Sequence, residues 1–211
     1  MATLFNDTDL FTSGELRIQQ FHIPDAELTL WEHFIQRAEA DQYYHTLLAE
    51  TPWKQEEITV YNKTYLTPRM TIWYGKQRDA HKSIRPFTPT LQLIKDKVEA
   101  ITNISFTSLL VNLYRDGKDG VGWHRDNERE HGPKPIVASV SFGETRAFDI
   151  RHKFRDDLQK IRIPLHHGSL LLMAGTMQHF WEHQVSKTAK KIKPRINLTF
   201  RIVHHKDLSL I

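Results

Sequence analysis

The 211-residue sequence contains no cysteine. This absence excludes disulfide bonds, thiolate metal sites and a cysteine nucleophile, so any metal ligand must be a histidine or an acidic side chain. No apolar run approaches the ~20 residues that a membrane-spanning helix needs, and the first ten residues lack the basic start and apolar stretch of a signal peptide. We therefore expect an intracellular protein with no membrane partner, cytoplasmic if its source is bacterial and nuclear if it is eukaryotic.

The sequence also lacks a Gly-rich phosphate loop, an H-E-x-x-H helix and a G-x-S-x-G elbow, which makes three common enzyme chemistries poor candidates. Charge is abundant but unevenly distributed: residues 1–60 carry a net charge of −8 and residues 61–211 carry +12. A basic portion of this size suits a polyanion such as nucleic acid. Charge alone fits an ordinary solvated surface equally well.

The length and the 39% hydrophobic content predict one globular domain. Residues 1–22 resemble an extended arm. The spacing of Trp31, Phe34, Ile35 and Ala38 then predicts an amphipathic helix that runs to about Leu48.

A second helix is indicated by Thr88 as the N-cap and Pro89 at the first position, followed by an apolar stripe. From Phe106 onward, short alternating segments separated by turn residues predict β-strands at 106–114, 136–142, 146–152, 160–165, 169–174 and 195–203. The sequence thus predicts an α+β fold with a jelly-roll body and flanking N-terminal helices.

The segment RINLTFRIV places all its polar residues on one strand face, namely Arg195, Asn197, Thr199 and Arg201. A surface strand with this face in water is the simplest interpretation. The segment 106–114 weakens it, because Asn112 and Tyr114 share a polar face and lead directly to residues 122–132. If both faces line the barrel interior, the polar residues form an anion pocket, and the two arginines would suit the two ends of a dicarboxylate.

The stretch GWHRDNEREHG contains an H-x-D pair, His124 and Asp126. A non-haem Fe(II) oxygenase binds iron through two histidines and one carboxylate and leaves the opposite face open. A third ligand has to come from a distant strand, and the candidates are His166, His167, His179 and His183. We favour His183 because it lies twelve residues before Arg195, with His179 as the second choice.

In this order, N-x-Y, H-x-D, a distal histidine and R-x-N-x-T-x-R resemble the AlkB family of Fe(II)/2-oxoglutarate dioxygenases, and most of all its DNA-repair members. The resemblance covers about residues 55–203 and includes PRMTIWYG, PIVASVSFG and HGSLLLM. It implies a double-stranded β-helix. We expect residues 1–54 to form an arm and helix packed on a dioxygenase domain at 55–211, the two together making a single structural unit. The resemblance also implies that Fe(II) is bound by His124, Asp126 and His183, and that 2-oxoglutarate, used together with dioxygen, is bound by Asn112, Tyr114, Arg195, Asn197, Thr199 and Arg201.

The resemblance further implies that an aromatic residue from TIWYG stacks on a flipped base. The candidates are Trp73 and Tyr74, of which we prefer Tyr74, although both could be core aromatics. An acidic residue is common after the H-x-D aspartate in DNA-acting members, whereas this chain has Asn127 there, so Asn127 or Glu128 is expected to contact the base together with Arg69.

Val60 and Tyr61 lie in a segment that matches a duplex-contacting hairpin of some family members. Candidates for phosphate contacts are Arg69, Lys76, Arg78, Lys187, Lys190, Lys191 and Lys193.

The expected function is oxidative removal of N-methyl groups from 1-methyladenine and 3-methylcytosine in single- or double-stranded DNA, which is direct repair of alkylation damage by a monomeric enzyme. Two alternatives stay open. The same chemistry could act on RNA or on a protein side chain, or the chain could be a non-catalytic jelly-roll binding module.

Overall fold

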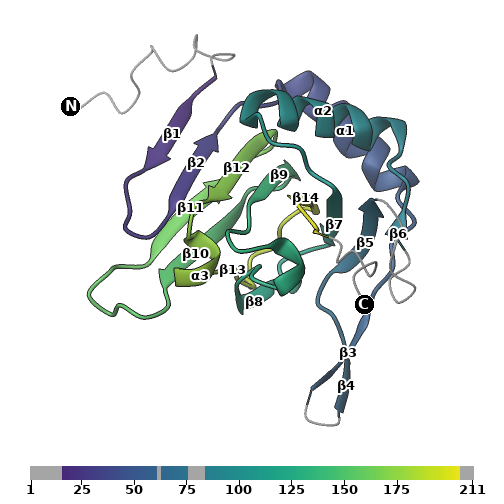
Figure 1. The fold of residues 1–211 in the computed structure, drawn as a ribbon. Coiled ribbons are helices and arrows are strands. Elements are labelled where there is room, and N and C mark those ends of the chain that lie inside the picture. The colour runs from purple at the N-terminus through teal and green to yellow at the C-terminus, as the bar shows by residue number, and fades with distance from the viewer. Residues whose placement is uncertain (1–15, 61–62, 76–83, 205–211) are drawn as a thin grey trace, which may run out of the picture.

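The computed structural model describes residues 16–60, 63–75 and 84–204, which form two facing sheets covered on one side by helices (Figure 1). The eight-stranded major sheet has the order β1 (Ile18–Phe21), β2 (Glu27–Trp31), β12 (Ser169–Ala174), β9 (Val137–Gly143), β14 (Arg195–Arg201), β7 (Ser108–Tyr114), β5 (Met70–Gly75) and β6 (Ile84–Arg85). The four-stranded minor sheet has the order β11 (Ile161–Leu165), β10 (Arg146–His152), β13 (Trp181–Val185) and β8 (Val121–His124).

The chain alternates between these sheets from β7 onward. It runs from β7 in the major sheet to β8 in the minor sheet and returns to the major sheet as β9. It then forms the β10–β11 hairpin in the minor sheet, returns to the major sheet as β12, crosses to the minor sheet as β13 and returns to the major sheet as β14. Neighbouring strands in this part are antiparallel. This winding is a double-stranded β-helix, so the predicted α+β fold with a jelly-roll core is confirmed.

Two apolar layers hold the molecule together. One lies between the major sheet and the helices and contains Leu91, Val98, Phe142 and Phe200. The other lies between the two sheets and joins major-sheet residues such as Leu171 to minor-sheet residues such as Ile150. Strand β14 has its apolar face in the first layer and β10 has its apolar face in the second, so burial fixes the side-chain alternation of these strands.

Helices α1 (Arg37–Glu50) and α2 (Pro89–Thr102) cover the outer face of the major sheet (Figure 1). Helix α2 begins as predicted, since the Thr88 hydroxyl accepts a hydrogen bond from the Leu91 N–H at 3.3 Å. No helix in the described part of the chain is long and apolar enough to cross a bilayer.

The predicted start of the first helix was wrong. Trp31 ends strand β2, which pairs with β12 and β1, and the helix begins only at Arg37. A short apolar run fits a strand or a helix equally well, and here pairing at the sheet decides the outcome. Residues 18–21 of the expected arm form β1, and residues 1–15 lie outside the described residues.

A separate two-stranded hairpin, β3 (Glu57–Val60) and β4 (Lys63–Leu66), projects from the body below β5 (Figure 1). It lies where the sequence resembles a duplex-contacting hairpin. Val60 ends β3, whereas Tyr61, Lys76 and Arg78 lie outside the described residues.

Candidate metal centre and anion pocket

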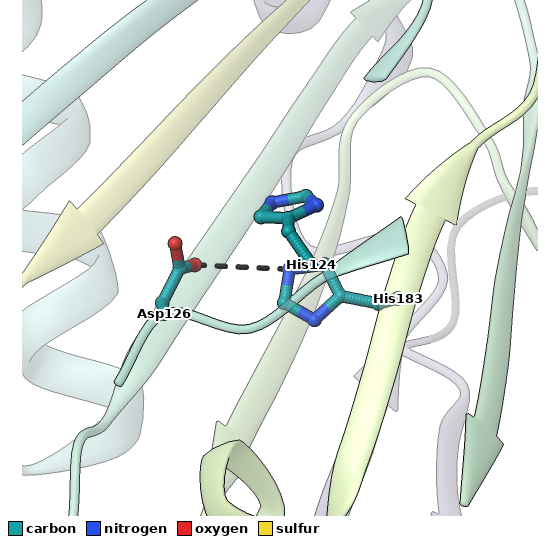
Figure 2. A group of neighbouring side chains, drawn as sticks. All are labelled: His124, Asp126 and His183. Atoms are coloured by element: carbon teal, nitrogen blue, oxygen red, sulfur yellow. Dashed lines mark ion pairs between the residues drawn. The ribbon is translucent and has the colours of Figure 1, made fainter. Parts of the chain in front are cut away.

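The three expected metal ligands lie together at the edge of the minor sheet. In the antiparallel pairing of β13 with β8, His183 lies opposite His124, and the centroids of their rings are 4.3 Å apart. Asp126 follows two residues after His124, and its carboxylate faces the two imidazoles (Figure 2). One possible ligand atom from each of the three residues lies within 4.8 Å of the other two.

Each oxygen of the Asp126 carboxylate has its own neighbour. Oδ1 accepts a hydrogen bond from Nη2 of Arg201 at 2.7 Å, and Oδ2 lies 3.8 Å from Nε2 of His183. Burial raises the pKa of the Asp126 carboxyl, but Arg201 and the two histidines outweigh it and lower the pKa to about 2. The carboxylate is therefore ionised at neutral pH, which is the form that binds a metal.

The surroundings of both histidines also suit metal ligands. Burial and the neighbouring His124 lower the pKa of His183 to about 3, so its ring is neutral at physiological pH. Nδ1 of His124 donates a hydrogen bond to the Gly122 carbonyl oxygen at 2.8 Å. This bond fixes the tautomer in which Nε2 is the free ring nitrogen.

The other candidate histidines lie elsewhere. His179 donates from Nε2 to the Pro133 carbonyl oxygen at 2.6 Å. His166 contacts the Thr145 hydroxyl, and His167 accepts a hydrogen bond from the Gly143 N–H, at the end of the β9–β10 region that faces helix α1. Among the described residues, only His183 of the four completes the group with His124 and Asp126.

A cavity of about 260 Å³ opens beside these ligands. It is lined by all six residues expected to bind an anion, which are Asn112, Tyr114, Arg195, Asn197, Thr199 and Arg201. Every residue of β14 is buried, so its polar face is not a solvent-exposed surface. The two polar strand faces therefore share one interior, as expected from their alternation.

Arg195 is the charged end of this cavity. It is 1% exposed, and burial lowers the pKa of its guanidinium to about 10. Nη2 donates to the Ser141 hydroxyl at 2.8 Å, and the guanidinium carbon lies 5.3 Å from the centre of the Tyr114 ring. Nε and Nη1 have no hydrogen-bond partner among the described residues. A buried cation with two free donors is suited to a bidentate carboxylate.

Asn197 and Thr199 form a local hydrogen-bond chain. Thr199 donates to the Asn197 amide oxygen at 2.9 Å, and the Asn197 amide nitrogen donates to the Ser139 hydroxyl at 2.8 Å. Sequence reasoning missed Ser139 of β9, which lines the cavity, and Ser141 of β9, which accepts the hydrogen bond from Arg195. Their alternation with Val140 and Phe142 in the sequence is the same signal that identified the polar face of β14.

The preference for Tyr74 over Trp73 was wrong. Trp73 lines the cavity, whereas Tyr74 is 2% exposed and lies in the apolar layer under the helices. Successive side chains of a strand point to opposite faces, so only one of the two neighbours can reach the cavity.

Glu128 lines the cavity and its side chain is 60% exposed, which places it at the mouth of the cavity, whereas the exposed Asn127 does not line it. The ring of His131 lies 3.4 Å from the Glu128 carboxylate, and this contact lowers the pKa of Glu128. Glu130 and His131 also line the cavity and were missed. Their place in the same charged stretch, GWHRDNEREHG, was the available signal.

Of the cations expected to contact phosphates, Arg69 lines the cavity, and its Nε has no hydrogen-bond partner among the described residues. Four lysines lie exposed in the segment between β13 and β14, namely Lys187, Lys190, Lys191 and Lys193.

Comparison with known proteins decides the family. A family profile described as "2OG-Fe(II) oxygenase superfamily" matches residues 27–201. The bovine "Alpha-ketoglutarate-dependent dioxygenase alkB homolog 3" is 41% identical over 183 residues, which cover 81% of this chain and 64% of the relative. The human "DNA oxidative demethylase ALKBH2" is 37% identical over 182 residues, covering 78% of this chain and 69% of the relative. The chain belongs to the AlkB family of 2OG-Fe(II) oxygenases.

The fold agrees with AlkB family membership. The solved structure of OsALKBH1 superposes with a TM-score of 0.61 at 18% identity, covering 88% of this chain and 100% of that chain. The name of the superfamily gives Fe(II) and 2-oxoglutarate as its cofactor and co-substrate. The chain spans less than two thirds of the length of the bovine relative.

Proposed function

We propose that this chain is an Fe(II)- and 2-oxoglutarate-dependent dioxygenase that removes N-methyl groups from nucleic-acid bases, with DNA as its substrate. The observation that carries the proposal is the group formed by His124, Asp126 and His183, which opens onto a cavity with a buried arginine at its far side.

The donor set fits Fe(II). Two imidazoles and one ionised carboxylate are the 2-His-1-carboxylate ligands of non-haem iron oxygenases. In the proposal, Arg201 orients Asp126 through its hydrogen bond to Oδ1, so that Oδ2 is the oxygen directed at the metal. Outer hydrogen bonds of this kind orient a ligating carboxylate.

The cavity fits 2-oxoglutarate. The free Nε and Nη1 of Arg195 supply a fork for one carboxylate, and the Tyr114 ring packs beside the same guanidinium. Asn112 and Arg201 lie closer to the metal ligands along the pair of strands β7 and β14, and we assign them to the other end of the molecule. Leaving the Arg195 charge buried and unpaired would be costly, which favours an anion as the natural occupant.

Held by His124, Asp126 and His183, Fe(II) would, with 2-oxoglutarate and dioxygen, supply the chemistry that hydroxylates the methyl carbon, with succinate and carbon dioxide as co-products, and the hydroxymethyl group would leave the base as formaldehyde. The protein orients and shields the reactants. A base has to leave the helix stack to reach the cavity, and Trp73, which lines the cavity, offers a stacking surface.

Charge at the mouth favours 1-methyladenine and 3-methylcytosine, which are cations. Glu128 lies at this mouth, and its lowered pKa keeps it ionised at neutral pH. The assignment to DNA is supported by the name of the human relative, a DNA oxidative demethylase. Monomeric state and location inside the cell stay predictions.

Succinate formation in the presence of Fe(II), 2-oxoglutarate and air tests the enzyme class. We expect His183→Ala to abolish it and His166→Ala to leave it within about twofold of wild type, because exposed positions away from the site tolerate substitution. Equal rates for the two variants would contradict the ligand assignment. No iron-dependent succinate from wild type would favour a non-catalytic binding module.

Matched DNA and RNA oligonucleotides carrying one 1-methyladenine test the substrate. We expect faster loss of the methyl group from DNA. Faster loss from RNA would overturn the assignment to DNA while keeping the reaction, and succinate without loss from either would move the substrate to another class.

A further inference from the structure

The short helix α3 (Met177–Phe180) is joined to the loop that carries Asp126. The backbone N–H of Asp126 donates to Oε1 of Gln178 at 2.9 Å. Nη1 of Arg125 donates to the His179 carbonyl oxygen at 2.7 Å, and the His179 ring donates to the Pro133 carbonyl oxygen at 2.6 Å. Three hydrogen bonds therefore hold one turn of helix against the H-x-D loop.

Gln178 is the buried member of this contact. It is 0% exposed, and its amide nitrogen points to Sδ of Met173 at 3.6 Å. Sulfur is a weak acceptor, so the strong hydrogen bond of this amide is the one that its oxygen accepts from Asp126. Both partners are buried, and no solvent replaces the bond when it is lost.

This contact can affect the metal ligands because of where α3 lies in the chain. The helix leads directly into β13, which carries His183, while the loop follows directly from β8, which carries His124. Gln178 thus connects the two chain segments that supply the metal ligands. Rotation of the peptide at Asp126 would turn the carboxylate away from the two imidazoles.

We infer that Gln178 is a positioning residue for the metal centre, holding the Asp126 backbone so that its carboxylate faces His124 and His183. The inference rests on the proposed function, because it assumes that these three residues bind a metal. His179 contributes to the same contact through its backbone and its ring.

A purely structural role for Gln178 makes a different prediction. If the amide served only to satisfy a buried N–H, its loss would lower the melting temperature of the metal-free protein and leave metal affinity unchanged. A positioning role requires that affinity fall in protein that is still folded. Metal affinity and thermal stability therefore have to be measured on the same samples.

The test is Mn(II) binding to metal-free protein, followed by the electron paramagnetic resonance signal of free Mn(II), without 2-oxoglutarate. Gln178→Met keeps the chain length of the side chain but removes the acceptor. We expect its affinity to fall about 10- to 100-fold, the usual effect of losing a hydrogen bond that orients a ligand. The control is Gln184→Met on β13, whose amide contacts Asp149 and Ser186 instead, and its affinity should stay within about twofold of wild type.

An unchanged affinity in folded Gln178→Met would overturn the inference, as would an equal loss in Gln184→Met. If Gln178→Met does not fold, Arg125→Met removes the neighbouring hydrogen bond from a partly exposed side chain. It should weaken Mn(II) binding by about 10-fold, the lower end of the usual effect, and an affinity within twofold of wild type would again overturn the inference. Wild type and His183→Ala are measured alongside, because equal binding by these two would contradict the proposed function itself.

Discussion

Arg195 shows how a single buried residue sets what the cavity accepts. Its guanidinium is enclosed by Tyr114 and Ser141, and its Nε and Nη1 have no hydrogen-bond partner in the part of the chain that the structure describes. Hydrogen bonds to a charged group contribute about 1.5–3 kcal/mol each. Loss of the Arg195 side chain should therefore mainly weaken the binding of 2-oxoglutarate.

We predict that Arg195→Met raises the KM for 2-oxoglutarate by about 10- to 100-fold. The measurement is succinate formation against 2-oxoglutarate concentration. Arg162→Met is the control, because Arg162 is an exposed arginine on β11 that pairs with Asp149. An unchanged KM in Arg195→Met would show that the carboxylate of 2-oxoglutarate assigned to Arg195 binds elsewhere.

Substitutions at Trp73 and Tyr74 should affect different properties, which are substrate binding for Trp73 and stability for Tyr74. Trp73→Ala is predicted to lower kcat/KM for a methylated oligonucleotide about 5- to 100-fold through lost stacking, with little change in unfolding free energy. Tyr74→Ala is predicted to cost about 3–5 kcal/mol of unfolding free energy, as for other large aromatics in cores. Urea unfolding and oligonucleotide kinetics on both variants check this, and an exchange of the two effects would contradict the assignment.

The sequence could identify the polar face of β14 but not the cavity side of β5. In β14, polar and apolar residues alternate strictly, so Arg195 and Arg201 had to share a face. In β5, Trp73 and Tyr74 are both aromatic and both could be buried. Only the packing of β5 between the helices and the cavity distinguishes them.

At the scale of elements, the loop after β7 is held by an acidic residue inside it. Asp119 is 3% exposed and accepts hydrogen bonds from the backbone N–H and the guanidinium of Arg115. Arg146 of β10 donates to the carbonyl oxygens of Asp119 and Ser186 and lies over the Tyr114 ring. The loop is therefore fixed beside the anion pocket.

Asp119→Asn is predicted to lower the free energy of unfolding at pH 7 by about 1–3 kcal/mol. Burial raises the pKa of Asp119, but the hydrogen bonds and charge of Arg115 outweigh it, so the folded pKa lies below 3.8. The contribution is thus present above pH 3.8 and is lost as pH falls through the folded pKa. Urea unfolding at several pH values should show the gap to wild type closing in acid, while a gap that widens in acid would contradict this.

The elements themselves were predictable where alternation was long. All six predicted strands exist, whereas β8 and β13 were not identified, although they carry His124 and His183. Strand β8 has four residues and contains Gly122, and β13 has three consecutive polar residues, so neither shows a clear alternation of polar and apolar side chains. The helix at Pro89 was predictable because capping is a local property, and the start of α1 was not, because it depends on strand pairing.

At the scale of the whole molecule, residues 1–60 are net acidic and residues 61–211 are net basic. Local structure does not explain this difference in net charge. The portion after residue 60 carries +12, and four of its lysines lie exposed between β13 and β14. The winding of the strands could not be derived from periodicity, since pairing order depends on distant contacts. It followed from the family resemblance and is confirmed by the sheet order.

Binding of an undamaged single-stranded oligonucleotide is predicted to weaken steeply with salt. Lys190→Gln together with Lys191→Gln should make the slope of log K against log salt shallower by about 1.4, which is 0.7 for each lost phosphate contact. The control replaces Lys95 and Lys97 of α2, which pair with Glu99 and Glu39. Fluorescence anisotropy measures the slopes, and equal slopes for wild type and the first variant would exclude these two lysines from phosphate binding.

The central claim is that the His124, Asp126 and His183 centre removes a methyl group from a nucleic-acid base. Its most direct test is mass spectrometry of a single-stranded DNA oligonucleotide bearing 1-methyladenine, incubated with Fe(II), 2-oxoglutarate and air, with wild type beside His124→Ala. We predict loss of one methyl group, with formaldehyde and succinate formed, by wild type alone. An oligonucleotide of unchanged mass with wild type, or equal loss with both proteins, would contradict the account.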